Sequence, residues 1–476
     1  MIIHFRQRHH SGLARSLRTL AAATILLGLV TVSSAQNLKV RPVAFAMYRS
    51  TGDWWIPESE PVQYMGAGIW GKYTWGKLAI ESEFINARYS GLSSIPSRFN
   101  PEQGLSWDQK AFDRDDDFYA DITTMLMSYT ADNLVLRMGQ HHLSWGPAYQ
   151  SIFGSEKPPP VPRLSFEWRP LPWLRFYYDH SQLTSVLQDS LASAVAPAKY
   201  GARRVMRSRN RVAHRFEAQL PWGLTLAGAE SVVYGDRGMD LIYMMPFISY
   251  WSAQHFLGDL DNTELSVDLT WEHASGWTVY GIFLMDEWTP ELTFESLNRN
   301  WFGWQYGLTR TGLLQSADYF MVEGTWTDHR IYRHKFPVND FYSHGYPVGH
   351  WAGPHAQSIT ALYQLSLGSG VGRVKFISAR RGALTDEMIV SQYKTENYKR
   401  FSGGTETMQA LRATFFWPVR EETWFELGVS KIDWWNAGFD PADPAGITQD
   451  ISKWSFNLGI YSNFHLTGYD ISDLYR

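Results

Sequence analysis

Short stretches of the chain alternate between apolar and polar residues, and this pattern predicts β-strands. In residues 425–430, Phe, Leu and Val alternate with Glu, Gly and Ser. Further stretches alternate in the same way, namely residues 215–220, 320–326, 358–367 and 454–461. A period of two over several residues is typical of strands with one apolar and one polar face. We therefore expect an all-β protein.

The connections between these stretches fall into two size classes. Tight turns are expected at residues 220–224, 273–277 and 367–371, whereas residues 94–117 and 379–404 are long and polar. Short turns on one rim and long loops on the other describe a transmembrane antiparallel β-barrel. Such a barrel has to be closed, because an open sheet edge in lipid leaves backbone groups unpaired. The chain length predicts about 16–18 strands.

The composition agrees with a membrane barrel. Aromatic residues make up 15% of the chain and include 22 tryptophans, and Trp and Tyr are enriched at membrane–water interfaces. A soluble β-sandwich also alternates, but it does not need this aromatic content together with unequal loops. The last alternating stretch ends near Phe464, and a polar tail follows at residues 467–476. The tail is either an extension beyond the barrel, or the closing strand lies elsewhere.

The first 35 residues have the pattern of a secretory signal peptide. Four arginines precede an apolar run at residues 20–32, and small residues at positions 33–35 suit cleavage before Gln36. The run is too short for a membrane anchor. We therefore predict a signal peptide over residues 1–35, followed by an outer-membrane β-barrel with short helical or irregular segments plugging its lumen over residues 36–476.

Charge, cysteine content and motifs exclude several functions. Removing the predicted signal peptide, with four arginines and no acid, takes the net charge from −4 to −8, whereas a nucleic-acid-binding protein would be basic. The chain has no cysteine, which excludes disulfides and thiolate metal sites. It also has no G-x-S-x-G elbow, no H-E-x-x-H motif and no glycine loop for phosphate. We expect no catalytic residues, no cofactor and no metal site.

Histidines and acids are weaker candidates for chemistry. His141 and His142 are neighbours at a strand end, so their side chains point to opposite faces and cannot bind one metal together. Three more histidines lie in a loop without a carboxylate at metal-binding spacing, namely His344, His350 and His355. The acids Asp286 and Glu287, or residues 115–117, could serve acid–base chemistry, which leaves a barrel-embedded hydrolase as a third possibility.

An arginine-rich stretch is the main candidate for ligand binding. No acid interrupts it, and its arginines are Arg203, Arg204, Arg207, Arg209, Arg211 and Arg215. Guanidinium groups pair bidentately with carboxylate or phosphate, so this stretch could bind an anionic polysaccharide. Its arginines could instead pair with acids on facing strands or touch lipopolysaccharide phosphate. Trp145 could stack on a sugar ring or pack inside the lumen.

Several segments outside the strands resemble the outer-membrane capsule-assembly proteins of the Wzi family, and they occur in the same order. A Trp-Gly-Pro segment comes first, followed by a proline segment, a Gly-Asp stretch, an acidic pair and two Gly/Pro segments. The matching positions are Trp145, Gly146, Pro147, Pro246, Asp259, Asn262, Asp286, Glu287, Gly345, Pro347, Gly349, Gly353 and Pro354. The chain departs from the family at Met245, Val348, His355 and the proline run 158–160.

This resemblance implies a lectin-like barrel of about eighteen strands that acts without catalysis. It implies that capsular polysaccharide or exopolysaccharide is held at the cell surface and that capsule assembly is assisted. The expected partners are outer-membrane lipid, lipopolysaccharide and an anionic polysaccharide, with no nucleic acid, and the protein is expected to be monomeric.

The alternative is a porin-like diffusion channel for small or acidic solutes, which keeps a water-filled bore. The first interpretation instead fills the lumen with residues 147–162 and 239–262. Within the second segment, residues 239–251 are apolar enough for a short helix, with Pro246 at a kink or at its start.

Overall fold

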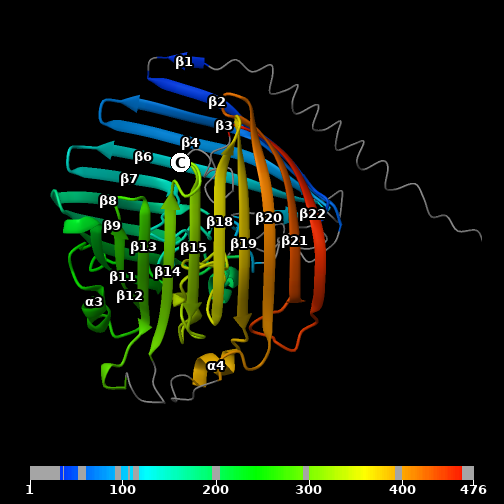
Figure 1. Cartoon of the computed structure of the whole chain (residues 1–476). Coiled ribbons are helices and arrows are strands. Elements are labelled where there is room, and N and C mark those ends of the chain that lie inside the picture. Colours follow the sequence, from blue (N-terminus) through cyan, green and yellow to red (C-terminus); the bar gives the residue numbers. More distant parts are fainter. Residues whose placement is uncertain are drawn as a thin grey trace, which may run out of the picture.

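The computed structural model describes residues 33–35, 37–51, 60–91, 98–105, 108–110, 117–195, 204–292, 300–391 and 399–463. In this part of the chain, eighteen antiparallel strands form one closed barrel (Figure 1). Strands that are consecutive in the wall pair with each other, and β22 pairs back onto β2. The predicted antiparallel barrel and strand number are confirmed.

The first half of the wall consists of β2 (Leu38–Arg49), β3 (Val62–Trp75), β4 (Leu78–Ser90), β6 (Asp117–Thr130), β7 (Leu134–His141), β8 (Val161–Leu171), β9 (Leu174–Leu183), β10 (Arg209–Leu220) and β11 (Leu224–Gly235). The second half consists of β12 (Asn262–Glu272), β13 (Trp277–Glu287), β14 (Trp301–Thr311), β15 (Tyr319–Thr327), β18 (Ala356–Leu367), β19 (Gly370–Gly382), β20 (Thr405–Arg420), β21 (Thr423–Ala437) and β22 (Gln449–Ser462).

Short elements lie between or beside these strands. They are β1 (Ser33–Ala35), β5 (Asp108–Lys110), β16 (Tyr342–Ser343), β17 (Tyr346–Pro347), the helices α2 (Ser190–Val195), α3 (Tyr250–Phe256) and α4 (Asp386–Ser391), and the 3-10 turns η1 (Pro221–Gly223), η2 (Pro290–Leu292) and η3 (Pro337–Asn339). None of the helices in the described ranges is long and apolar enough to cross a membrane.

The alternating pattern determines which side chains face into the barrel. In β21, Leu427 is 51% exposed on the outside, whereas its neighbour Glu426 is buried on the inside. In β22, Trp454 and Phe456 are exposed and Ser455 is buried. Apolar side chains outside and polar side chains inside are the arrangement of a barrel in lipid. All five alternating stretches lie in strands, namely β10, β15, β18, β21 and β22.

The two rims of the barrel differ as the connections predicted. Residues 220–224, 273–277 and 367–371 form tight turns on one rim. Gly223 in the first turn has φ 74°, and a Cβ there would lie 2.1 Å from the backbone oxygen of Glu272, so glycine is required. The other rim carries the long connections. Strand β19 extends to Gly382, further than the predicted start of the loop at residue 379.

The ends of the chain are described only in part. Strand β22 ends at Ser462 and is the closing strand, because it pairs with β2 as well as with β21. The polar tail at residues 467–476 lies outside the described residues. The predicted signal peptide does so too, apart from β1, which pairs with β2.

Two long connections lie against the inner face of the wall. They are residues 142–160, between β7 and β8, and residues 328–355, between β15 and β18. The Ser155 amide donates to the Val348 carbonyl at 2.9 Å, and the Tyr332 hydroxyl donates to the Ile152 carbonyl at 2.6 Å. Ile152 itself is fully buried. We call these two connections the inner loops.

The prediction that residues 239–262 lie in the lumen is wrong. Tyr243 and Tyr250 pack against Val212 and Val232. Arg211 faces the inner loops, so the next residue, Val212, and its partner Val232 on β11 point outward. The segment therefore covers the outer face of β9, β10 and β11. Its apolar content favours lumen filling, but apolar side chains also suit a surface in lipid. We call residues 237–261 the outer strap.

The short helix predicted within this segment is also displaced. Residues 239–249 form turns and bends, and α3 begins at Tyr250, after Pro246. Figure 1 shows α3 at the outer edge of the ribbon, beside β11 and β12.

Candidate functional site

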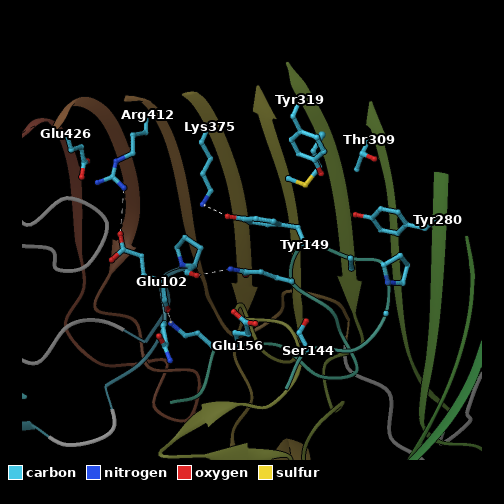
Figure 2. Close-up of a pocket in the computed structure, with 18 of the residues that line it drawn as sticks. Glu102, Ser144, Tyr149, Glu156, Tyr280, Thr309, Tyr319, Lys375, Arg412 and Glu426 are labelled. Carbon is cyan, nitrogen blue, oxygen red and sulfur yellow. Dashed lines mark hydrogen bonds and ion pairs between the residues drawn. The ribbon is translucent and has the colours of Figure 1, made fainter. Parts of the chain in front are cut away.

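A polar cavity of about 510 Å³ lies inside the barrel (Figure 2). Side chains of β2, β13, β14, β15, β19, β20, β21 and β22 contribute to its lining. Because these strands lie at different places around the wall, their side chains can meet only in the interior of the barrel. The volume is within the range of about 300–1,000 Å³ that is usual for small-molecule sites.

The first inner loop forms the floor of this cavity. The chain turns at Gly146, where φ is 95°, and then presents Tyr149 and Gln150. The Tyr149 amide donates to Glu323 of β15 at 2.9 Å, and the Gln150 side chain donates to the Pro101 carbonyl at 2.8 Å. The floor is thus tied both to the wall and to residues 98–105.

Lys157, a buried residue of the first inner loop, fixes this loop to residues 98–105. The Lys157 ammonium donates to the Asn100 carbonyl at 2.8 Å and to the Glu102 carbonyl at 2.6 Å. Burial lowers the pKa of Lys157 to about 7, although the nearby Glu102 carboxylate opposes this shift. The lysine is therefore costly to bury and is stabilised by the oxygens around it.

Charges of both signs line the wall on one side. Arg49 of β2 lies 3.2 Å from the Glu102 carboxylate, and Arg412 of β20 lies 3.8 Å from the same group. The Tyr461 hydroxyl donates to Glu426 at 2.5 Å. Figure 2 shows Arg412 and Glu102 facing each other across this part of the cavity.

Tyrosines and a lysine line the cavity beside these pairs. The Lys375 ammonium lies 3.2 Å from the Tyr149 hydroxyl and 5.2 Å from the centre of the Tyr149 ring. Tyr280 and Tyr319 complete this side (Figure 2). Tyrosine offers both a ring face and a hydroxyl, and lysine offers a cation. Such a surface can bind a ligand that carries hydroxyl groups and a carboxylate.

The cavity lies between the inner loops and the short-turn rim. Tyr319 is the first residue of β15, Thr309 lies near the end of β14, and Glu426 and Tyr461 lie close to the ends of their strands. All these strand ends are at the rim of the short turns. The inner loops, by contrast, start from the opposite rim and reach across the interior.

The structure separates the predicted arginine stretch into an outer and an inner group. Arg203 lies outside the described residues. Arg204 and Arg207 are exposed at the long-loop rim, and Arg207 forms an ion pair with Asp236. The inner group is Arg209, Arg211 and Arg215, which all face into the barrel from β10.

Each arginine of the inner group is bonded to the protein itself. Arg209 donates to the Asp340 carbonyl of the second inner loop. Arg211 donates to the Phe153 carbonyl of the first inner loop at 2.9 Å. Arg215 donates to the Asp268 carboxylate of β12 at 3.0 Å. Arg209 and Arg211 thus connect the wall to the inner loops, and Arg215 connects β10 to β12, two strands further along the wall.

The positions that resemble the Wzi family form two groups in space. Trp145 is buried against Phe153 and Tyr177, while its neighbours Gly146 and Pro147 line the cavity. Asp286 accepts the Tyr332 amide, and Gly349 lies against Ile152. Together with Glu287, Gly345, Pro347, Gly353 and Pro354, these residues belong to the inner loops or to the strand end next to them. By contrast, Pro246 and Asp259 lie in the outer strap, and Asn262 begins β12.

The described histidines and acids do not gather into a metal site. No group of three or more His, Cys, Asp or Glu among the described residues could hold a metal ion. Burial lowers the pKa of His142 to about 3, and its ring contacts Gln103 at 2.6 Å. Residues 115 and 116 lie outside the described residues, and Asp117 forms an ion pair with Arg88.

Sequence reasoning pointed to Gly146 and Pro147 but missed the wall residues that line the cavity. Arg49, Tyr280, Lys375 and Arg412 come from four strands spread along the whole chain. In the sequence, these residues can be recognised only as charged or tyrosine side chains on the polar face of a strand. Alternation can reveal this feature, but it does not show which strands face each other.

The fold and its polar interior define the class of protein as a β-barrel of the outer-membrane type. No protein-family model matches the chain, and no curated protein matches its sequence. Among solved structures, the chain is similar to Wzi of Escherichia coli, with a TM-score of 0.53 and 13% identity over 95% of this chain and 89% of that chain. Wzi is described as an outer membrane protein involved in group 1 capsule assembly and as a carbohydrate-binding β-barrel.

Two further solved structures are also similar to the chain. OccK5 (OpdH) of Pseudomonas aeruginosa has a TM-score of 0.45 and 10% identity, over 90% of this chain and 97% of that chain. OprD of the same organism has a TM-score of 0.40 and 12% identity, over 89% and 94%. The likeness to Wzi shows a shared barrel fold.

Proposed function

We propose that this protein is a non-catalytic barrel of the outer membrane, a distant relative of the Wzi family, that binds an anionic capsular polysaccharide or exopolysaccharide and assists its assembly. The cavity is the observation that carries this proposal. Its tyrosines suit sugar rings and hydroxyls, and its lysine and arginines suit carboxylates. The description of Wzi as a carbohydrate-binding barrel supports the same ligand class.

The inner loops favour binding over passage of solutes. They cross the interior, and hydrogen bonds fix them to several strands, including Ile152 to Gln305 of β14 at 3.0 Å. A diffusion channel needs a continuous water-filled path, and we propose that these loops interrupt such a path and leave the cavity as a recess. We propose that the recess faces the periplasm, because short turns lie on that side in outer-membrane barrels. The protein would then bind a growing polysaccharide on the periplasmic side, before the polymer reaches the cell surface.

The carboxylates of the cavity fit a binding role without catalysis. Glu102 faces two arginines, and Glu426 accepts a hydroxyl. The Glu102 pairs tie residues 98–105 to the wall, and the Glu426 bond joins β21 to β22, so we assign both carboxylates to structure. The exposed Arg204 and Arg207 at the other rim remain candidates for a second contact with surface polysaccharide or with lipopolysaccharide phosphate.

Binding of an acidic polysaccharide to the purified barrel tests this proposal. Lys375→Gln removes a cavity cation but keeps a polar side chain, and we expect affinity to fall about tenfold, or about 1.4 kcal/mol. The matched control is Lys77→Gln in the turn after β3, where the side chain is exposed. A neutral polysaccharide should be unaffected by either change. Equal affinity of wild type and Lys375→Gln for the acidic polymer would remove the cavity from the proposal.

A further inference from the structure

The outer strap covers polar side chains on a face of the barrel that should be apolar. His214 and Glu230 point outward from β10 and β11, with the His214 ring nitrogen 3.3 Å from the Glu230 carboxylate. His180 of β9 also points outward and contacts the Tyr234 hydroxyl at 2.7 Å. All four side chains are buried or partly buried beneath the strap. Uncovered, they would form a polar patch in a wall of apolar side chains.

Hydrogen bonds hold the strap onto this patch. The Tyr250 amide donates to Glu230 at 2.7 Å, and the Ser249 hydroxyl donates to the same carboxylate at 3.1 Å. The His214 ring bonds to the Pro246 carbonyl at 2.9 Å and stacks on Tyr250 at 4.4 Å. These contacts satisfy polar backbone groups that hydrocarbon could not.

The opposite face of the strap is mainly apolar, although Ser252 and His255 are also exposed. Leu241 is 79% exposed, Trp251 54% and Phe256 81%. No Asp, Glu, Lys or Arg occurs between Asp240 and Asp259. Charged residues lie only at the two ends of the strap, where Arg237 forms an ion pair with Asp261 at 2.5 Å.

The apolar face continues the surface of the neighbouring strands. Leu164 of β8 and Val267 and Leu269 of β12 are exposed on either side of the strap. The strap also reaches far down the wall, since Phe247 packs on Phe176, the third residue of β9 from the short-turn rim. Its ends are at the long-loop rim, where β11 ends and β12 begins.

We propose that the outer strap is a membrane-embedded lid, which seals a polar patch of the wall and presents its own apolar face to lipid acyl chains. The occupant of this surface is lipid because charge is absent from the stretch that crosses the wall and the apolar surface is continuous with that of the barrel. A contiguous exposed apolar surface is typical of a membrane or protein contact. The proposal rests on the membrane setting of the barrel and not on polysaccharide binding.

Spin labels on single cysteines test this placement, because the natural chain has no cysteine. Met245→Cys and Trp251→Cys place labels on the strap, Val267→Cys places one on the bare wall, and Leu314→Cys places one in the turn after β14. The labelled proteins are refolded into vesicles of phosphatidylethanolamine and phosphatidylglycerol. Collisions with oxygen, which enters hydrocarbon, are compared with collisions with a water-soluble nickel chelate.

Strap labels should behave like the Val267 label, with oxygen colliding more often than nickel, and the Leu314 label should show the reverse. Should nickel dominate on the strap while Val267 reports lipid, the strap lies in water and the proposal fails. Should neither reagent reach the strap, a protein surface such as a second copy covers it, which also overturns the proposal. Leu241→Cys gives another strap position if Trp251→Cys disturbs folding, and the Val267 label reports separately whether the barrel inserts.

Discussion

Single buried side chains position the inner loops, and Lys157 is the clearest case. Its ammonium is surrounded by carbonyl oxygens of residues 100 and 102, and the residue is only 3% exposed, so little water can hydrate the charge. Arg211 does the same from the wall, by donating to the Phe153 carbonyl. In both cases a cation is bonded to backbone oxygens, so its loss leaves acceptors unpaired inside the protein.

Lys157→Met should destabilise the folded barrel by about 1–3 kcal/mol, because the oxygens that accept from Lys157 lose their donor. The effect should depend on pH. The pKa of Lys157 is about 7 in the folded barrel, whereas that of an ordinary lysine is 10.5. Between these values the unfolded chain binds more protons, so wild-type stability rises with pH. The deficit of the variant should therefore grow from pH 7 to pH 10.5.

Urea unfolding in lipid vesicles, followed by tryptophan fluorescence, measures this difference. Lys77→Met serves as the control, since its side chain lies exposed in a turn. A deficit that stays constant across this pH range would mean that Lys157 does not titrate as its burial predicts.

At the scale of elements, the two inner loops approach each other closely at Gly349. A Cβ on Gly349 would lie 2.2 Å from the Ile152 carbonyl oxygen and 2.3 Å from the Tyr332 hydroxyl. The hydrogen bond between Tyr332 and Ile152 runs through the same place. The loops can therefore approach only where residue 349 has no side chain.

Gly349→Ala should push the inner loops apart and cost about 1–3 kcal/mol of stability, as overpacking usually does. Gly281→Ala in β13 is the matched control, because nothing lies within 4 Å of its Cβ position. Unfolding of the two variants under identical conditions gives the comparison. If both behave like wild type, the loops adjust freely and the contact at Gly349 is not restrictive.

Local and distant features differed in how well the sequence predicted them. Alternation predicted the strands because side-chain direction follows from position within one strand, as in residues 454–461 of β22. The outer strap was misplaced because apolar content does not distinguish a lumen from lipid. The cavity was missed because its residues come together only through the pairing of strands.

At the scale of the whole molecule, the interior combines a closed wall with loops that enter from one rim. The loops are anchored to β10, β14 and β15, so they are attached on more than one side. Between them and the short turns lies the cavity, where Arg49 and Arg412 face the Glu102 carboxylate. We infer that ions find no wide path through this barrel.

Planar-bilayer recording of the purified protein should show low or no conductance. An open porin inserted under the same conditions provides the reference for successful incorporation. Large, stable steps from this protein would favour the diffusion channel, and the inner loops would then have to move aside in the membrane.

The pairing of β2 with β22 has a consequence for how the chain is assembled. The Asn463 side chain donates to the Pro42 carbonyl across 421 positions of sequence, so this contact joins the two ends of the wall. Contacts of such long range form slowly, and one edge of β2 has to wait until β22 has been synthesised. A chain that stops before β22 keeps an open edge that lipid does not tolerate. Strand β22 thus acts as a checkpoint, because only copies that contain it can close the wall.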